Sequence, residues 1–210
     1  MIKVNSYKFQ VSDLSIHRNG RELINDVNFN LVSGNCCMVH GANGVGKSTF
    51  LRAIAGLRPS FGGSILLKND KLDSELVFTD LVCYQGHKSG ISLNLTVLDN
   101  IYFFASIYKT EPSDLDHLIN QFSLNELLNK SINALSAGEQ KRVSIVTTFL
   151  KKAKLWILDE PSINLDTAGC AALNFAITER LNNGSIFILA THHLDQFKSL
   201  ATHQLQLGET

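Results

Sequence analysis

The segment GANGVGKST, residues 41–49, combines three glycines with a lysine and two hydroxyl side chains at the spacing G-x-x-x-x-G-K-[ST]. It follows the apolar run 36–40 and precedes a helical pattern, which is the strand–loop–helix setting that this spacing requires. Glycines let the loop turn its amides inward, where they and the positive end of the next helix attract phosphate oxygens. The pattern predicts a phosphate-binding loop made of Gly41, Ala42, Asn43, Gly44, Val45, Gly46, Lys47, Ser48 and Thr49.

Two side chains of this loop have separate predicted roles. Lys47 would bridge the β- and γ-phosphates of a nucleoside triphosphate, and the Ser48 hydroxyl would be a ligand of Mg²⁺. The alternative is a glycine-rich turn that happens to precede a lysine. The apolar run before the loop and the helical pattern after it argue against that alternative.

A second candidate group is the pair of carboxylates that ends the apolar run LWILDE, residues 155–160. Ligands of parallel sheets bind at the carboxyl ends of the strands, where Asp159 and Glu160 are expected. Asp159 would hold Mg²⁺ through its water shell, and Glu160 would act as the general base on the attacking water. By itself the pattern is weak, because any buried strand can end in acidic residues. The phosphate-binding loop makes it stronger.

The segment LSAGEQKRVSI, residues 135–145, has the pattern of a helix start. Ser136 can cap the first turn, and Glu139 can reach back to complete a capping box. This interpretation does not explain Gly138, since glycine inside a helix costs about 1 kcal/mol relative to alanine. A bare backbone with outward-facing amides is an additional reason for glycine at this position.

The wider pattern predicts the elements that position these residues. Apolar runs from Cys36, Asp80, Lys154 and Ser185 alternate with helical patterns over 46–57, 139–153 and 168–183. Such alternation predicts an α/β fold with a mostly parallel sheet covered on both faces. Residues 1–35 alternate more clearly and contain the turn RNGRE, which predicts a small antiparallel β flank. We expect a single domain over 1–210, with an α/β core of 1–87 and 135–210 and a helical subdomain of 88–134.

Composition limits the environment and the partners. The chain is 44% hydrophobic, and its 19 basic residues balance 19 acidic ones, so no global field favours nucleic acid. The sequence contains neither a signal-peptide pattern nor an apolar run of about 18 residues, so we expect a cytoplasmic protein without its own membrane span. The four cysteines, Cys36, Cys37, Cys83 and Cys170, lack metal-site spacing and are expected to be reduced. Cys36, Cys37 and Cys83 lie in apolar runs, so we expect them at buried strand positions.

In this order, the segments resemble the nucleotide-binding subunit of ATP-binding-cassette (ABC) transporters over nearly the whole chain. LSAGEQ resembles the family's signature motif, PSINLD (161–166) its D-loop, and ATHHLD (190–195) its switch-histidine segment. The resemblance implies a P-loop NTPase of the ABC ATPase type that hydrolyses ATP with Mg²⁺. It also implies a homodimer in which Ser136 and Gly138 of one copy complete the ATP site of the other. Asp166, at its place in the D-loop pattern, would be a further nucleotide-binding residue. His192 would contact the γ-phosphate, although a histidine after a buried strand is often only a rim residue.

Two positions depart from the common pattern of that family. Arg18 stands where an aromatic ring usually stacks on adenine, and a guanidinium plane can also stack on a base. His87 stands where the Q-loop glutamine is usual, and a histidine there can still order water or sense Mg²⁺. We therefore expect both residues to take part in nucleotide binding.

The segment 84–108 is similar to one branch of the family, the ATP-binding subunit of the bacterial haem exporter in cytochrome c maturation. That resemblance implies a peripheral protein on the cytoplasmic face of the inner membrane, bound to a membrane permease. A periplasmic haem chaperone would be an indirect partner. The segment 88–110, centred on Ile101, Phe103 and Phe104, would receive the permease's coupling helix, and its alternative is plain helical core.

Three other functions are open at this point. The first is the ATPase subunit of another small ABC exporter. The second is an ABC ATPase that acts on nucleic acid or ribosomes, which the balanced charge and the lack of a long coiled coil disfavour. The third is an inactive cassette, which the intact set of Lys47, Asp159, Glu160 and His192 disfavours.

Overall fold

The computed structural model describes residues 6–18, 21–59, 62–69 and 78–208. The chain forms two compact units. Unit 1 contains both β-sheets and comprises Met1–Gly86, Ala153–Pro161 and Ile177–Thr210. Unit 2 is helical and comprises His87–Lys152 and Ser162–Ala176.

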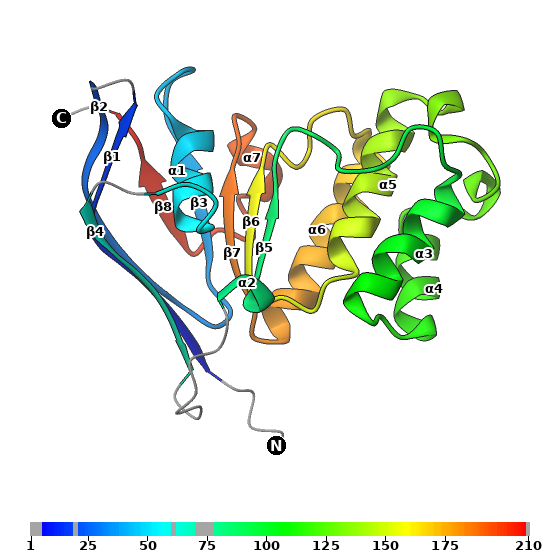
Figure 1. Cartoon of the computed structure of the whole chain (residues 1–210), viewed down its shortest axis with the longest axis horizontal. Helices are drawn as coiled ribbons and strands as arrows, with labels where there is room; N and C mark the ends of the chain where they lie inside the picture. The colour runs from blue at the N-terminus through cyan, green and yellow to red at the C-terminus, as the bar shows by residue number, and fades with distance from the viewer. Residues whose placement is uncertain (1–5, 19–20, 60–61, 70–77, 209–210) are drawn as a thin grey trace. The chain divides into compact units, whose positions relative to one another are not determined.

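The antiparallel sheet of unit 1 confirms the β flank predicted for the N-terminal region. Its order is β2-β1-β4, in which both neighbouring pairs are antiparallel (Figure 1). Phe9 pairs with Leu31, and the buried residues of β1 alternate with more exposed ones, as a sheet with one covered face requires. The strands are β1 (Tyr7–Arg18), β2 (Arg21–Val32) and β4 (Gly62–Asn69).

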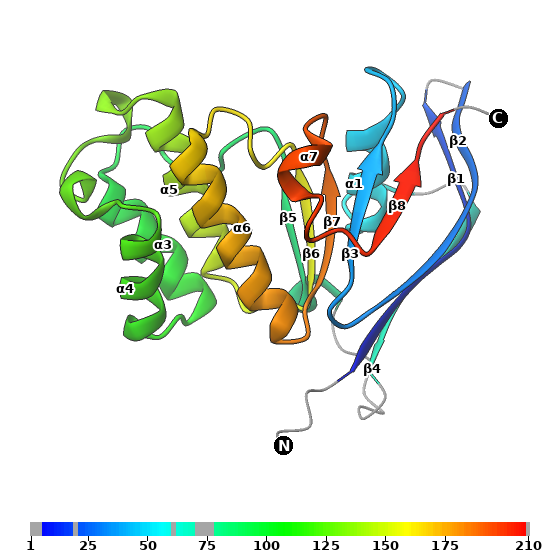
Figure 2. The same cartoon turned by 180° about the vertical axis from the view of Figure 1, so that it is seen from behind.

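The second sheet of unit 1 is the predicted parallel sheet, with the order β5-β6-β7-β3-β8 (Figures 1 and 2). Every residue of β6 and β7 is buried, because parallel strands are covered on both faces. The run from Asp80 begins differently from the expectation, since α2 (Phe78–Leu81) precedes the strand. The strands are β3 (Cys36–His40), β5 (Val82–Gln85), β6 (Leu155–Asp159), β7 (Ile186–Ala190) and β8 (His203–Gln206).

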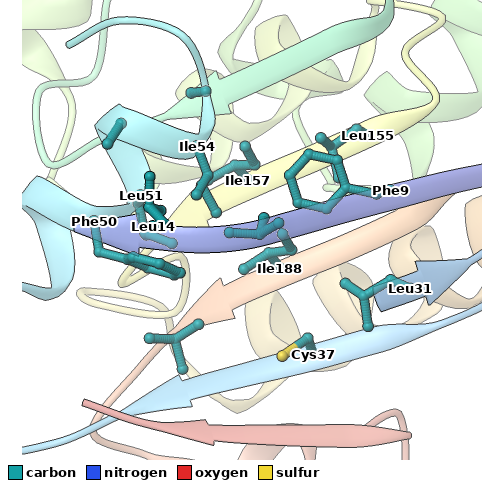
Figure 3. Close-up of a cluster of buried hydrophobic side chains, with 14 of the residues drawn as sticks. Phe9, Leu14, Leu31, Cys37, Phe50, Leu51, Ile54, Leu155, Ile157 and Ile188 are labelled. Carbon is teal, nitrogen blue, oxygen red and sulfur yellow. The ribbon is translucent and has the colours of Figure 1, made fainter. Parts of the chain in front are cut away.

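The core of unit 1 forms around α1 (Lys47–Ile54), which contacts β1 of the antiparallel sheet and both β6 and β7 of the parallel sheet. Figure 3 shows side chains from all three layers packed together. Full burial of a ring such as that of Phe50 contributes about 1.5–3 kcal/mol relative to exposure, so this cluster holds α1 against both sheets. The members labelled there are Phe9, Leu14, Leu31, Cys37, Phe50, Leu51, Ile54, Leu155, Ile157 and Ile188.

Unit 2 extends beyond the 88–134 segment that the sequence suggested as a helical subdomain. It also contains α5, because that helix packs against α3 and α4, together with the N-terminal part of α6. The single ABC ATPase domain over 1–210 stays a prediction. The helices are α3 (Val97–Tyr108), α4 (Pro112–Gln121), α5 (Ala137–Phe149) and α6 (Thr167–Asn182), with 3-10 turns η1 (Asn125–Leu127) and η2 (Ile132–Ala134).

Two helices of unit 2 begin with the same capping arrangement. At α5, the Ser136 hydroxyl accepts from the Glu139 amide, and Glu139 Oε2 accepts from the Ser136 amide at 2.8 Å. At α3, Thr96 and Asp99 make the equivalent pair of bonds at 3.1 and 3.2 Å. Each pair satisfies backbone donors that the first helical turn leaves open. The capping box predicted at Ser136 is confirmed.

The prediction of buried strand positions for Cys36, Cys37 and Cys83 is confirmed. Cys36, Cys37 and Cys83 are buried on strands, whereas Cys170 is half-buried on α6. Burial raises the pKa of the Cys36 and Cys37 thiols to about 12, and for Cys36 the neighbouring Cys37 adds to the effect. Among the helices that the structure describes, none is both long enough and apolar enough to cross a bilayer.

Candidate functional site

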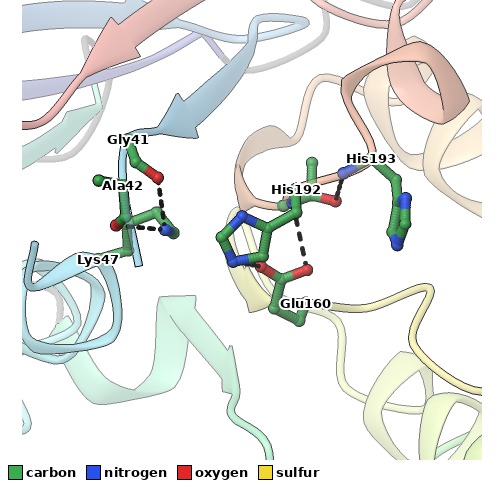
Figure 4. Close-up of polar contacts among 7 residues, drawn as sticks. Gly41, Ala42, Lys47, Glu160, His192 and His193 are labelled. Carbon is green, nitrogen blue, oxygen red and sulfur yellow. Dashed lines mark hydrogen bonds and ion pairs between the residues drawn. The ribbon is translucent and has the colours of Figure 1, made fainter. Parts of the chain in front are cut away.

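The predicted phosphate-binding loop lies in unit 1 between β3 and α1. Its lysine, Lys47, is buried, and its Nζ donates to the carbonyl oxygens of Gly41 at 2.8 Å and Ala42 at 3.1 Å (Figure 4). Ala42, Asn43 and Gly44 are exposed at the tip of the loop. The ammonium group is therefore held against the inner side of the loop, where a phosphate could replace the two carbonyl partners.

The parallel sheet brings three predicted segments to one edge. In the strand order, β7 lies directly between β3 and β6, and all three strands run in the same direction. The loop 41–46 follows β3, Glu160 follows β6, and His192 lies just beyond the end of β7. Their carboxyl ends share an edge, which is where ligands bind in such sheets. Residues far apart in sequence thus meet because their strands are neighbours.

Glu160 and His192 form a direct pair at this edge. His192 Nε2 lies 3.2 Å from Glu160 Oε1, and the His192 amide donates to Glu160 Oε2 at 3.4 Å (Figure 4). The glutamate side chain is 5% exposed and the histidine side chain 45% exposed, so the histidine covers the carboxylate from the solvent side. His193, which received no predicted role, donates its amide to Thr191 Oγ1 at 2.9 Å.

The backbone of Glu160 is strained. Its φ is +50°, in the left-handed region that residues other than glycine seldom adopt. Such a backbone conformation costs on the order of 1–3 kcal/mol. The Glu160 amide donates to the Ala190 carbonyl oxygen of β7 at 2.8 Å, and this bond holds the residue in place. This left-handed conformation turns the chain at the end of β6, and the Glu160 carboxylate lies beside His192.

Asp159 is the last residue of β6 and is 1% exposed. Its charge acts on the phenol of Tyr84 on β5. Burial raises the pKa of the Tyr84 phenol, and the charge of Asp159 acts in the same direction. Arg52 of α1 opposes both effects through its Nε, which donates to the Tyr84 hydroxyl at 3.3 Å.

The signature segment and the D-loop meet within unit 2. Gly138 lies in the first turn of α5, and a Cβ placed on it would be 2.9 Å from the carbonyl oxygen of Asn164. A real Cβ does not come that close to a backbone oxygen, so this contact is a second reason for glycine here. Asn164 has a φ of +66°, a conformation that asparagine tolerates better than most residues. Sequence reasoning missed Asn164, and an asparagine in a short loop was the available signal.

Asp166 has a structural role in unit 2. Its Oδ1 accepts from the Gly169 amide at 2.8 Å, which caps the first turn of α6. The side chain is otherwise exposed. Capping explains an aspartate here without any ligand, and the predicted contact with a partner's nucleotide stays a prediction.

Comparison with known proteins decides the family. The profile of the ABC transporter family matches residues 24–163. The chain belongs to the ABC transporter family. It is an ATPase, and in this family the hydrolysis of ATP is coupled to transport.

Individual relatives of this ABC ATPase agree with the profile. It is 33% identical over 204 residues to the cytochrome c biogenesis ATP-binding export protein CcmA of Vibrio vulnificus (strain YJ016), covering 95% of this chain and 99% of that protein. It is 32% identical over 182 residues to the CcmA protein of Paracoccus denitrificans (strain Pd 1222), covering 87% of this chain and 81% of that protein. A solved ATP-binding subunit of an ABC transporter superposes with a TM-score of 0.81 at 26% identity, covering 95% of this chain and 85% of that one.

Arg18 and His87 were also predicted to contact the nucleotide of this ABC ATPase. Arg18 ends β1, and its side chain lies outside the described residues. His87 is exposed and is the first residue of unit 2, directly after Gly86, the last residue of the first segment of unit 1. Gln85, in contrast, is buried at the end of β5. The buried glutamine therefore belongs to the sheet of unit 1, and the exposed histidine to unit 2.

Only some side chains of the segment 88–110, which was predicted to bind a permease, are exposed. Ile101 is fully buried in unit 2, which agrees with the alternative of plain helical core for this residue. Helical periodicity turns this residue inward, while Phe103 is 57% exposed and Phe104 is half-buried. Phe104 packs between Phe103 and Tyr108, with ring centroids 5.3 and 6.1 Å away.

Proposed function

We propose that this chain is the ATP-hydrolysing subunit of a haem exporter in cytochrome c biogenesis, peripheral to the cytoplasmic face of the inner membrane. ATP hydrolysis is supported by the pairing of Glu160 with His192 at the sheet edge, next to the loop that holds Lys47. The assignment to a haem exporter is supported by the similarity to CcmA proteins over nearly the whole chain. Haem delivery would occur at a periplasmic haem chaperone, and haem itself need not touch this chain.

The residues of the loop 41–49 fit a nucleoside triphosphate. The backbone amides of the loop and the start of α1 supply donors, and the Lys47 ammonium supplies a positive charge. On binding, Lys47 would exchange the carbonyls of Gly41 and Ala42 for β- and γ-phosphate oxygens. The ammonium group is already placed for that exchange, so little reorganisation is needed.

Ser48 and Asp159 fit Mg²⁺, because hydroxyl and carboxylate oxygens are the ligands that this hard cation prefers. Ser48 is the second residue of α1, after Lys47, and Asp159 is the last residue of β6, which contacts α1. When bound, Mg²⁺ neutralises charge on the phosphates. The protein's part is to present these two oxygens from rigid elements.

Glu160 would act as the general base. A water between Glu160 and the γ-phosphate would transfer a proton to the carboxylate as its oxygen attacks phosphorus, and ADP would leave. His192, 3.2 Å from Oε1, keeps the carboxylate in one orientation, and its exposed edge is available to a phosphate oxygen. The strained backbone of Glu160 suits this role, because such strain often accompanies a precisely placed side chain.

The complete ATP site would form between two copies arranged head to tail. Ser136 and the amides near Gly138 would donate to the γ-phosphate held by the partner subunit, with Asp166 close by. Arg18 would stack on the adenine, and His87 would order water near Mg²⁺. The exposure of Ser136 and Ala137 at the start of α5 supports this arrangement.

The permease would bind unit 2 at exposed apolar side chains of the segment 88–110. Tyr102 and Phe103 are 59% and 57% exposed on α3, and Ile107 is 54% exposed. Large apolar side chains gathered on one surface helix commonly mark an interface with another protein. In the loop before α3, Leu93 and Leu95 are also exposed, by 48% and 40%.

The first experiment measures covalent haem in c-type cytochromes of cells that lack this gene. Complementation by the wild type should restore the haem, whereas Glu160→Gln should not, because it binds ATP without hydrolysing it. Normal cytochromes in the deletion strain would overturn the haem assignment. The ABC ATPase activity would then belong to another exporter, whose permease should co-purify with the chain.

The second experiment tests the shared site. Ser136→Arg should abolish hydrolysis while a single chain still binds ATP, because the arginine would fill the space of the partner's γ-phosphate. Equilibrium binding of a fluorescent ATP analogue and release of phosphate separate the two effects. Hydrolysis at the wild-type rate in this variant would show that the head-to-tail site is wrong.

A further inference from the structure

The carboxylate of Glu139 occupies the two donors of Ser136 at the head of α5. Its Oε2 accepts from the Ser136 amide at 2.8 Å and from the Ser136 hydroxyl at 2.7 Å. Bonds this short to a carboxylate are charge-assisted and stronger than bonds between neutral groups. A phosphate oxygen that approached this helix start would need the same donors.

The charge of Glu139 is maintained by its surroundings. The hydrogen bonds from the Ser136 hydroxyl and amide lower the pKa of Glu139, and the charges of Lys130 and Arg142 act in the same direction. The side chain is thus an anion at neutral pH. It would repel a phosphate anion that came to the same donors.

We propose that Glu139 is an intramolecular competitor for the partner subunit's γ-phosphate at Ser136, and this inference rests on the proposed head-to-tail dimer. Before the dimer closes, the carboxylate releases Ser136 and turns towards Lys130 and Arg142, which are close enough to influence its charge. The Ser136 hydroxyl and amide then donate to the phosphate instead. The exchange raises the ATP concentration that closure requires, while the capped state protects the start of α5 in the open form.

The chain contains a matched control for this proposal. Asp99 Oδ2 accepts from the Thr96 amide at 3.2 Å and from the Thr96 hydroxyl at 2.6 Å, so the start of α3 has the same chemistry. Neither residue has a proposed contact with nucleotide. Loss of charge at Asp99 therefore reports the effect of a weakened capping box alone.

The test uses the full chain with Glu160→Gln, in which ATP should drive dimers that persist. Light scattering against ATP concentration gives the half-maximal concentration for dimerisation. Adding Glu139→Gln should lower it about five-fold, because glutamine keeps a capping box but makes neutral instead of charge-assisted bonds. Glu139→Asp, which keeps the charge, should restore the original value, and Asp99→Asn should leave it unchanged.

The outcomes separate the competitor from the dimer itself. Dimers with the same ATP dependence in Glu139→Gln and its parent would overturn the competitor and leave the head-to-tail site standing. An equal shift in Asp99→Asn would also overturn it, because the effect would then be one of capping. If monomers bind ATP but no variant dimerises, the head-to-tail site is wrong, and the competitor with it.

Discussion

A pair of alanine substitutions in the phosphate-binding loop tests the packing around it. Gly41 has a φ of +151°, and a Cβ placed on it would collide with the carbonyl oxygen of Leu207 and lie 3.1 Å from Val45 Cγ1. Leu207 cannot easily retreat, since its amide donates to the His40 carbonyl oxygen at 2.8 Å beside the β3–β8 pairing. Gly44 has a φ of +82°, and a Cβ placed on it would have no other atom within 4 Å.

The expected costs follow from these two environments. Alanine with a positive φ costs about 1 kcal/mol, and this is the whole cost of Gly44→Ala. Gly41→Ala adds a collision with a fixed backbone, for which overpacking costs about 1–3 kcal/mol more. The total for Gly41→Ala is therefore about 3 kcal/mol. For a chain of this size, about 1 kcal/mol lowers the Tm by about 2–4 °C.

Thermal unfolding followed by circular dichroism measures the difference between the variants. We expect Gly41→Ala to unfold about 4–8 °C below Gly44→Ala, at equal protein concentration and without nucleotide. Equal Tm values in the two variants would refute the reasoning, because the close approach of the Leu207 carbonyl to Gly41 would then have no energetic effect.

Three further predictions concern separate features. Asp166→Ala removes the cap on the Gly169 amide and should lower stability by about 1 kcal/mol in urea unfolding, whereas Asp166→Asn should keep most of it. The thiols of Cys36 and Cys37 ionise near pH 9 when unfolded but near pH 12 when folded, so stability should fall as pH rises above 9. Urea unfolding of the double alanine variant should show a smaller alkaline loss. Lys47→Ala should abolish binding of a fluorescent ATP analogue, and unchanged affinity would contradict its proposed role.

Short-range patterns in the sequence were sufficient to predict much of this protein. The capping box of Ser136 and Glu139 joins residues three apart, so its geometry depends on local backbone alone. The apolar runs of β6 and β7 indicated strands buried on both faces, because side chains of a parallel sheet are covered from two sides. The spacing of the loop 41–49 identified the element on which a phosphate would bind.

The order of the strands in the sheet places Glu160 beside His192, which the sequence alone did not show. Glu160 and His192 lie 32 positions apart in the chain, and they meet because β6 and β7 are neighbours in the sheet. The edge strand β8 was not predicted, since its residues are mostly exposed and lack a clear apolar alternation. A pairing partner is not visible in the local sequence, because the hydrogen bonds that define a sheet join distant segments.

The residue types at the candidate site were thus determined by the sequence alone, and their surroundings by the tertiary structure. The orientation of α3 turned Ile101 inward and left Phe103 exposed, although both are apolar residues of one predicted helix. The carbonyl oxygen of Asn164 leaves no room for a Cβ at Gly138, and the sequence around the glycine does not reveal this contact. Motifs arise from local chemistry, whereas burial and close approach depend on segments that only folding brings together.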